Sequence, residues 1–441
     1  MPKKIAEPTT PLQERAFIVG VEFRGQDNLL SMDESLAELS LLVDTAGLEV
    51  IGQTIQRLDH PYVKTFIGPG KIEEIQILVE ELSIDVIIFD DELSPRHQRE
   101  LEDIFSDKVR IVDRTALILD IFAQHAHTKE GALQVELAQY EYRLPRLTRA
   151  WTHLARQAGG GGGRTGATGG VGLRGPGETQ LEVDRRDIRR RITHLKSEIE
   201  KIRSHRQQHR SRRKKSGIPV VALVGYTNAG KSTLLNILTQ ANVFVADQLF
   251  ATLDPVTRRV ELGNGHVALM TDTVGFIQKL PTTLVAAFRA TLEEITEADL
   301  LLHLVDISHP EARLHVKAVY DLLVEIEADH IPALIVLNKI DRLNDSDQAE
   351  KVSSDYPNAV AISALNGQGI PALLGKINQT LYENYHDITV MLPYSEGGLI
   401  ALFHDQGLVS STENIPGGVI IRGKIQGRLL TNYHSYIKID P

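Results

Sequence analysis

The chain has 441 residues, of which 42% are hydrophobic and 24% charged, values typical of soluble globular proteins, and its length allows about three domains. No apolar run approaches the ~20 residues needed to span a bilayer, and the N-terminus lacks the apolar stretch of a secretory signal, so we expect a cytoplasmic protein. The chain has no cysteine, which excludes disulfides, thiolate zinc sites and cysteine nucleophiles, and its net charge of -10 argues against nucleic-acid binding by the whole surface.

The first 130 residues alternate short apolar runs with segments of helical periodicity. We expect strands over Arg15 to Phe23, Leu48 to Ile55, Asp85 to Asp90 and Val109 to Val112. We expect helices over Met32 to Ala46, Lys71 to Leu82 and Pro95 to Phe105. Strands that alternate with helices of this length indicate a parallel sheet covered by helices. Residues 1–130 are therefore expected to form an N-terminal α/β domain.

Residues 131–217 are expected to form two helical arms joined by a glycine-rich loop. The loop, residues 159–177, is expected to be exposed because each glycine loses more backbone entropy on ordering than any other residue. Beyond it, apolar residues recur at helical spacing to about Arg213.

The second arm is strongly basic. Between Arg185 and Lys215 there are fourteen Lys or Arg residues and only three acidic residues. Helices stabilised by salt bridges mix both signs, so we interpret this arm as a surface for RNA or another phosphate backbone rather than as a solvated charged face. The expected RNA contacts are Arg164, Arg174, Arg185, Arg186, Arg189, Arg190, Lys196, Arg203, Arg206 and Arg210, with Arg143, Arg146, Arg149, Trp151 and Arg156 on the opposite arm.

A phosphate-loop motif opens the next expected domain, residues 218–385. It lies between an expected strand, Pro219 to Val224, and an expected helix that starts at Thr233. In such a loop, backbone N–H groups face the phosphates, Lys231 neutralises the outer phosphates and Ser232 ligates Mg²⁺. The alternative is a chance Gly-rich turn. The expected contacts are Gly225, Tyr226, Thr227, Asn228, Ala229, Gly230, Lys231, Ser232 and Thr233.

Two further segments are expected to complete a magnesium and γ-phosphate site. Asp272 follows an apolar strand and is placed to hold a magnesium-bound water, while the N–H of Gly275 can touch the γ-phosphate. Upstream, the candidate switch segment Phe250 to Asp254 offers Thr252 as the second hydroxyl on Mg²⁺. Thr257 is the competing ligand.

Phe276 stands where many small GTPases have the Gln that orients the attacking water. Phenylalanine cannot hydrogen-bond water, so hydrolysis by the protein alone is expected to be slow and to be raised by a partner. The alternative is that this side chain only packs a switch loop, and both can hold. The expected catalytic set is Lys231, Thr252, Gly275 and Phe276.

The base is expected to be guanine. Asn338, Lys339 and Asp341 follow the expected strand Ala333 to Leu337, and the Asp341 carboxylate can accept from both N1–H and the 2-amino group of guanine. Adenine offers neither donor, and a site built for a hydrogen bond can reject its absence by ~10⁴. A helix cap is the alternative for this motif alone. The backbone contact to guanine O6 is expected from Ser363, Ala364 and Leu365.

Three other patterns carry less weight. Gly170 to Gly175 is a literal G-x-G-x-x-G, but it follows a glycine tract rather than a strand, so a nicotinamide-dependent oxidoreductase is a distant alternative. His205 and His209 have the spacing of a zinc pair but no acid between them. The run Gly68 to Lys71 lacks phosphate-loop spacing and is interpreted as a turn that opens a helix.

Residues 386–441 are β-rich and predict a small α+β domain.

Together these residues resemble the HflX family of GTPases. The resemblance covers essentially the whole chain and rests on the glycine loop, Gly175 to Glu182, Ile67 to Lys71, Phe250 to Asp254 and Asp272 to Phe276. It implies a ribosome-associated GTPase whose arms enter the RNA-rich core of the large subunit and whose GTP-bound form helps to split stalled or idle ribosomes under stress. It also implies that K⁺ binds at Asn228, which matches a K⁺-binding position in related GTPases. Some members are reported to bind ATP through the N-terminal region, where this sequence has no phosphate loop.

We therefore expect a monomeric, cytoplasmic GTPase that uses GTP, GDP and Mg²⁺, binds the large ribosomal subunit and its RNA, binds no DNA and has no membrane span. The alternative is a nucleotide-gated RNA-binding or ribosome-assembly factor in which hydrolysis is secondary.

Overall fold

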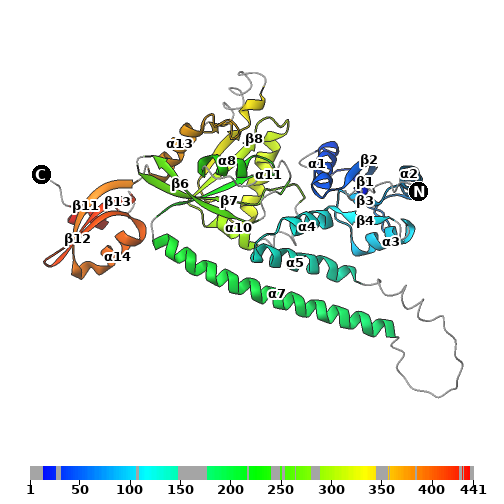
Figure 1. Cartoon of the computed structure of the whole chain (residues 1–441), viewed down its shortest axis with the longest axis horizontal. Coiled ribbons are helices and arrows are strands. Elements are labelled where there is room, and N and C mark those ends of the chain that lie inside the picture. The colour runs from blue at the N-terminus through cyan, green and yellow to red at the C-terminus, as the bar shows by residue number, and fades with distance from the viewer. Residues whose placement is uncertain are drawn as a thin grey trace, which may run out of the picture. The chain divides into compact units, whose positions relative to one another are not determined.

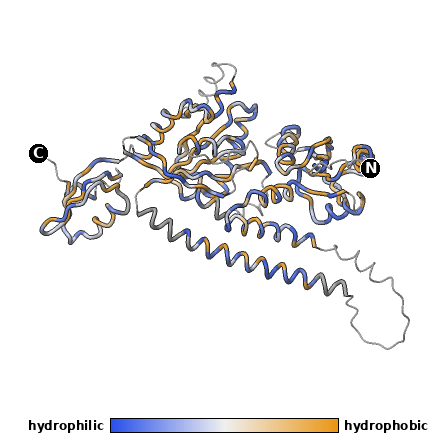
Figure 2. The backbone as a smooth tube through the Cα atoms, viewed as in Figure 1, coloured by the Kyte–Doolittle hydropathy of each residue, from blue (hydrophilic) through white to orange (hydrophobic). Residues whose placement is uncertain are grey.

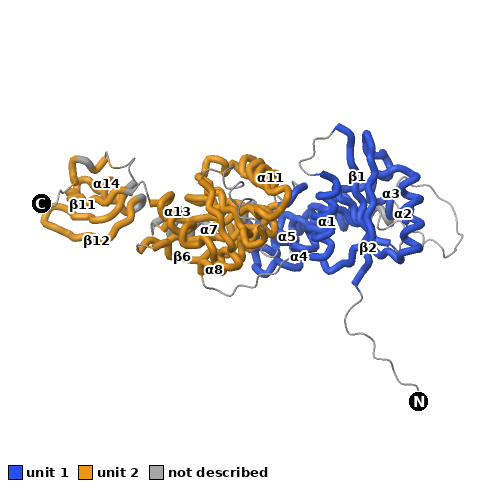
Figure 3. The backbone as a smooth tube through the Cα atoms, turned by 90° about the horizontal axis from the view of Figure 1, so that it is seen from above, with its two compact units in different colours: residues 1–199, 247–253, 277–289 blue, residues 200–246, 254–276, 290–441 orange. Residues whose placement is uncertain are grey.

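The computed structural model describes residues 13–25, 31–105, 109–147, 176–215, 218–239, 249–250, 254–263, 265–279, 289–343, 356, 358–382, 385–426, 430 and 432–437. The chain divides into two compact units (Figure 3). Unit 1 holds residues 1–199 with two short segments, 247–253 and 277–289. Unit 2 holds residues 200–246, 254–276 and 290–441.

Unit 1 contains the parallel sheet expected from the sequence, with strand order β2-β1-β3-β4. Its strands are β1 (Arg15–Phe23), β2 (Glu49–Leu58), β3 (Val86–Phe89) and β4 (Arg110–Asp113). Its helices are α1 (Met32–Thr45), α2 (Pro69–Leu82), α3 (Pro95–Phe105) and α4 (Arg114–His125), coloured blue to cyan in Figure 1. The side chains of Phe17, Ile75 and Leu101 are buried in one apolar core, so the sheet packs together with α2 and α3.

The helical region follows, with α5 (Lys129–Arg143), η1 (Leu144–Arg146) and α7 (Pro176–Lys215). Apolar residues recur along α7 among hydrophilic ones (Figure 2), and Leu195 among them is fully buried. Two ion pairs join α7 to α5: Arg191 to Glu136 at 2.7 Å and Lys196 to Glu141 at 2.8 Å. The two helices are therefore joined by ion pairs between their side chains.

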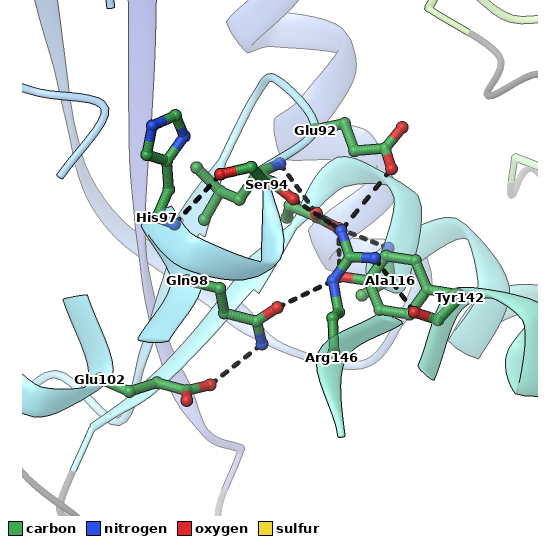
Figure 4. Close-up of polar contacts among 10 residues, drawn as sticks. Glu92, Ser94, His97, Gln98, Glu102, Ala116, Tyr142 and Arg146 are labelled. Atoms are coloured by element: carbon green, nitrogen blue, oxygen red, sulfur yellow. Dashed lines mark hydrogen bonds and ion pairs between the residues drawn. The ribbon is translucent and has the colours of Figure 1, made fainter. Parts of the chain in front are cut away.

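Arg146 ties the end of this first arm to the sheet (Figure 4). Its guanidinium donates to the carbonyl oxygen of Leu93 at 2.6 Å, to Gln98 Oε1 at 3.0 Å and to Asp113 Oδ2 at 3.3 Å. The same group lies 3.5 Å above the Tyr142 ring, and only 12% of the side chain is exposed. The guanidinium of Arg146, one of the basic side chains expected on the RNA-binding arms, is thus engaged by contacts within the fold.

Unit 2 contains a six-stranded sheet with strand order β10-β9-β8-β5-β7-β6, in which only β6 is antiparallel to its neighbour. The strands are β5 (Val220–Gly225), β6 (Val256–Gly263), β7 (His266–Asp272), β8 (Leu300–Asp306), β9 (Ala333–Asn338) and β10 (Val360–Ala361). The other elements are α8 (Lys231–Thr239), α10 (Arg289–Thr296), α11 (Ala312–Glu325), η2 (Ile340–Arg342) and α13 (Ile370–Tyr382). Parallel strands place their carboxyl ends at one edge of the sheet, where ligands bind in such folds.

The C-terminal part of unit 2 is a small antiparallel sheet with strand order β11-β13-β12. It comprises β11 (Tyr385–Pro393), η3 (Tyr394–Glu396), α14 (Gly397–Gln406), β12 (Leu408–Ile415), β13 (Gly418–Gln426) and η4 (His434–Tyr436). Phe403 of α14 is buried against this sheet. These elements confirm the expected multidomain α/β fold class. None of the helices in the described ranges is long and apolar enough to cross a bilayer.

Candidate functional site

The site is built on the loop between β5 and α8. Gly225 (φ 153°) and Gly230 (φ 94°) have backbone conformations that other residues rarely adopt. A side chain at Gly225 would collide with the carbonyl oxygen of Leu304, and one at Gly230 would collide with the amide of Asn338. The loop therefore needs glycine at both positions, as the sequence motif predicts.

Lys231 begins α8 and is buried within this loop. Its Nζ donates to the carbonyl oxygens of Gly225 at 3.1 Å and Tyr226 at 2.9 Å. Burial lowers the pKa of Lys231 to about 8, although the charge of Asp272 acts in the opposite direction. The ammonium group is thus held at the centre of the loop, where it would be neutralised by a bound anion.

Two side chains with oxygen atoms that could bind a metal ion lie beside Lys231. The Ser232 hydroxyl donates to Asp272 Oδ2 at 2.7 Å, and Asp272 ends β7, which pairs with β5. A hydroxyl and a carboxylate are ligands that Mg²⁺ prefers, so the donor set fits this ion. Thr257 belongs to β6 and lies 2.9 Å from the Thr271 hydroxyl, within the sheet. Its competitor Thr252 lies outside the described residues.

The segment after Asp272 lies directly against the phosphate loop. The backbone N–H of Phe276 donates to Gly225 O at 3.1 Å, and the N–H of Thr227 donates to Phe276 O at 2.7 Å. A Cβ atom on Gly275 would lie 3.0 Å from Lys231 Nζ. Phe276 is only 4% exposed. Its side chain therefore packs inside the protein, as one of the two expected roles requires.

Asn338 joins the phosphate loop to a second loop. Its Nδ2 donates to the carbonyl oxygen of Ala229 at 2.8 Å, and its Oδ1 accepts from the backbone N–H of Ala364 at 2.9 Å. Nearby, the Ser363 hydroxyl donates to Asp341 Oδ1 at 2.5 Å. The structure thus brings the motif at residues 338–341 together with the one at 363–365, whose last residue, Leu365, is 74% exposed.

Unit 1 also includes Phe250, from the candidate switch segment, and Lys279, which follows Phe276 by three residues, and sequence reasoning placed neither side chain. Lys279 Nζ lies 2.5 Å from Asp90 Oδ2 and 2.6 Å from Asp91 Oδ1. The Phe250 ring meets the Phe122 ring edge-to-face, with centroids 4.6 Å apart. Burial raises the pKa of Asp90, but the charges of Arg114 and Lys279 outweigh it, and the pKa lies below its usual value. No local pattern signals these contacts, because the partners are far apart in the sequence.

The basic residues of α7 divide into those with an ion-pair partner and those without one in the described part of the chain. Lys196 pairs with Glu141, and Arg206 lies 3.8 Å from Glu294 of α10. Arg190 and Arg203 pair with acids one turn away on α7 itself. Arg186 and Arg189 are exposed, Arg185 is partly exposed, and among the residues that the structure describes these three have no ion-pair partner. Arg164 and Arg174 lie outside the described residues, and of Arg210 only its place in α7 is described.

Three family models match the chain in series. They are described as GTP-binding GTPase N-terminal (residues 33–123), GTP-binding GTPase Middle Region (125–213) and 50S ribosome-binding GTPase (220–339). Together they follow the order of the α/β domain, the helical region and the phosphate-loop domain.

Curated relatives extend over nearly the whole chain. The chain is 45% identical over 392 residues to GTPase HflX of Escherichia coli (strain K12), which covers 89% of this chain and 88% of that protein. It is 43% identical over 425 residues to GTPase HflX of Caldanaerobacter subterraneus subsp. tengcongensis, covering 96% and 94%. A solved GTP-binding protein from Sulfolobus solfataricus in complex with GDP shares 26% identity over 84% of this chain and 99% of that one, with a TM-score of 0.43.

Proposed function

Because the chain belongs to the HflX family of GTPases, which bind GTP and hydrolyse it to GDP and phosphate, we propose that this protein binds the large ribosomal subunit and promotes the splitting or rescue of ribosomes under stress. The observation that carries the proposal is that one chain holds both a phosphate loop joined through Asn338 to the expected base motif and a basic helix with exposed arginines.

The assigned residues of the nucleotide site are part of this proposal. The phosphate loop from Gly225 to Thr233 surrounds the phosphates, and Lys231 leaves its carbonyl partners to meet the outer phosphate oxygens. Asp341 accepts from the guanine edge and is held in place by Ser363. Asn338 keeps the phosphate loop and the base loop in register.

Mg²⁺ would be held by Ser232 directly, by Asp272 through water and by Thr252. When bound, it neutralises phosphate charge and orients the leaving group. K⁺ would bind at Asn228, an exposed residue of the phosphate loop with a left-handed backbone (φ 57°). Turnover in KCl that exceeds turnover in NaCl, and that loses this preference in Asn228→Ala, would support this ion; equal rates in both salts would remove it.

The contact of residues 275–276 with the phosphate loop bears on hydrolysis. A Cβ atom on Gly275 would lie 3.0 Å from Lys231 Nζ, so this segment or the Lys231 side chain moves before a γ-phosphate can lie between them. Phe276 has no group that can orient water, so the intrinsic rate is slow, and a group supplied by the ribosome raises it; such groups contribute roughly 10³ to 10⁵ in other GTPases.

We assign large-subunit binding to the two helical arms, of which α7 is the second. Positively charged side chains that contact RNA phosphates release counterions, so binding weakens steeply with salt. Arg186 and Arg189 lie on α7 without ion-pair partners in the described part of the chain, which makes them better phosphate contacts than Lys196 or Arg206.

The test compares two charge reversals of equal size on exposed helices. Arg186→Glu with Arg189→Glu should weaken co-sedimentation with purified large subunits. It should also lower the slope of log affinity against log salt by the amount expected for about two phosphate contacts. Arg313→Glu with Lys317→Glu on α11 is the matched control and should leave binding intact. Equal losses in both variants would show nonspecific attraction instead of an interface on α7.

A second candidate function is favoured by buried Phe276: a nucleotide-gated RNA-binding or assembly factor in which hydrolysis is secondary. The two differ in whether turnover is needed. One round of ribosome splitting with a non-hydrolysable GTP analogue fits both, whereas repeated rounds by substoichiometric protein require hydrolysis. Equal multiple-round yields with GTP and with the analogue would favour the second candidate.

A further inference from the structure

A carboxylate outside the sequence motifs lies beside the proposed base site. Asp306 ends β8, where it is paired in register with Asn338 of β9. Its Oδ2 lies 2.7 Å from Lys339 Nζ. Its Oδ1 accepts from the Ser308 backbone N–H at 3.0 Å and from the Ser308 hydroxyl at 2.6 Å. Both carboxylate oxygens of Asp306 are therefore engaged, and the orientation of the group is fixed from two sides.

Lys339, the partner of Asp306, has an unusual backbone conformation. Its φ of 66° and ψ of 34° are left-handed values that non-glycine residues rarely adopt, and they turn the chain from β9 into η2. A lysine side chain ordinarily has many rotamers, but here the Nζ is held by Asp306. The two side chains are only 14% and 17% exposed, so water competes weakly for the pair.

The neighbours of Lys339 in sequence are already fixed. Asn338 is tied to Ala229 and Ala364, and Asp341 is tied to Ser363. The Lys339 side chain is in turn held by its ion pair with Asp306. Burial acts to raise the pKa of Asp306, but the hydrogen bonds from Lys339 and Ser308 lower it below its usual value, so the group is charged at neutral pH.

We propose that Asp306 is a positioning residue for the guanine nucleotide, which holds the Lys339 stem in place as one wall of the base site while Ser308 holds Asp306. The inference rests on the nucleotide site proposed above and deepens it. A long side chain that is already ordered loses less freedom when a ligand packs on its methylene stem, so the tether raises affinity by preorganisation.

The test is a double-mutant cycle read out by GDP affinity and GDP dissociation rate. Asp306→Asn should weaken GDP binding about three- to tenfold, mainly through faster dissociation, which is the range expected for ordering one such side chain. Lys339→Met should weaken it as well. In the Lys339→Met background, Asp306→Asn should have no further effect, because its partner is gone.

Asp299→Asn is the matched control, since Asp299 precedes the opposite end of the same strand and accepts from the backbone N–H of Val220 at 2.8 Å. It should leave GDP affinity unchanged. Ser308→Ala is a milder variant that keeps the Asp306 charge and should give a smaller loss, again absent in the Lys339→Met background.

Two results would overturn the inference: equal effects of Asp306→Asn in both backgrounds, or reduced thermal stability with unchanged GDP affinity. Wild-type protein that fails to bind GDP would instead contradict the nucleotide site itself, so the two failures can be told apart.

Discussion

Replacing Asn338 by alanine tests whether one buried amide holds the two halves of the nucleotide site together. Asn338 is almost fully buried and makes two hydrogen bonds, to the Ala229 carbonyl and from the Ala364 N–H. The variant leaves both backbone groups without this partner, and each buried polar group so left costs about 1–3 kcal/mol. We expect a loss of about 2–5 kcal/mol in the free energy of unfolding, measured by urea denaturation.

The same substitution should weaken GDP binding by tenfold or more, because the phosphate loop and the base loop are no longer joined. The control is Tyr382→Phe, which removes the hydrogen bond that the Tyr382 hydroxyl donates to the Val267 carbonyl at 2.8 Å, away from the phosphate loop. It should cost about 1 kcal/mol and leave GDP affinity unchanged. An Asn338→Ala protein that loses stability but keeps its GDP affinity would refute the reasoning, since Asn338 would then support the fold alone.

Three further outcomes are expected. Asp341→Asn should lower GTP affinity and shift preference toward xanthine nucleotides, whose 2-oxo group accepts from an amide; unchanged GTP-over-ATP selectivity in Asp341→Ala would contradict the base assignment. The pKa of Lys231 is lowered to about 8, and bound phosphates raise it, so the complex holds more protons than the free protein above that pH. GDP affinity should therefore fall as pH rises from 8 to 10, with proton uptake on binding in calorimetry; a flat profile would argue against a lysine of lowered pKa. Thr252→Ala should reduce magnesium-dependent turnover at least tenfold, whereas Thr257→Ala should have little effect because that hydroxyl is engaged in the sheet; the reverse order would reassign the ligand.

Local patterns predict the fold and the phosphate loop well because they are encoded over a few consecutive residues. The strand Arg15 to Phe23 and the helix Pro95 to Phe105 match the structure in their bounds, since each is an unbroken periodic segment between turns. Gly225 and Gly230 are likewise explained by the loop they form. The helix Pro69–Leu82 begins earlier than its periodicity indicates, because proline is favoured in the first helical turn.

Contacts between distant segments are what the sequence does not reveal. The Leu249 N–H donates to Thr45 Oγ1 across 204 residues of chain, and no periodicity links them. In the sequence, Arg206 is one more basic residue on a helix, and only the fold shows that Glu294 lies beside it. Asp306 was not predicted for the same reason: its partner Lys339 becomes adjacent only when β8 and β9 pair.

The most direct test of the proposed function is GTP turnover by the purified protein, alone and with purified large ribosomal subunits, at low and at high salt. We expect a slow basal rate, raised many-fold by the subunits and lost as salt rises, because the ribosome supplies what Phe276 lacks and is bound through basic side chains. Tight GTP binding with no stimulation by the subunits would leave the GTPase fold intact but contradict the large subunit as its activating partner.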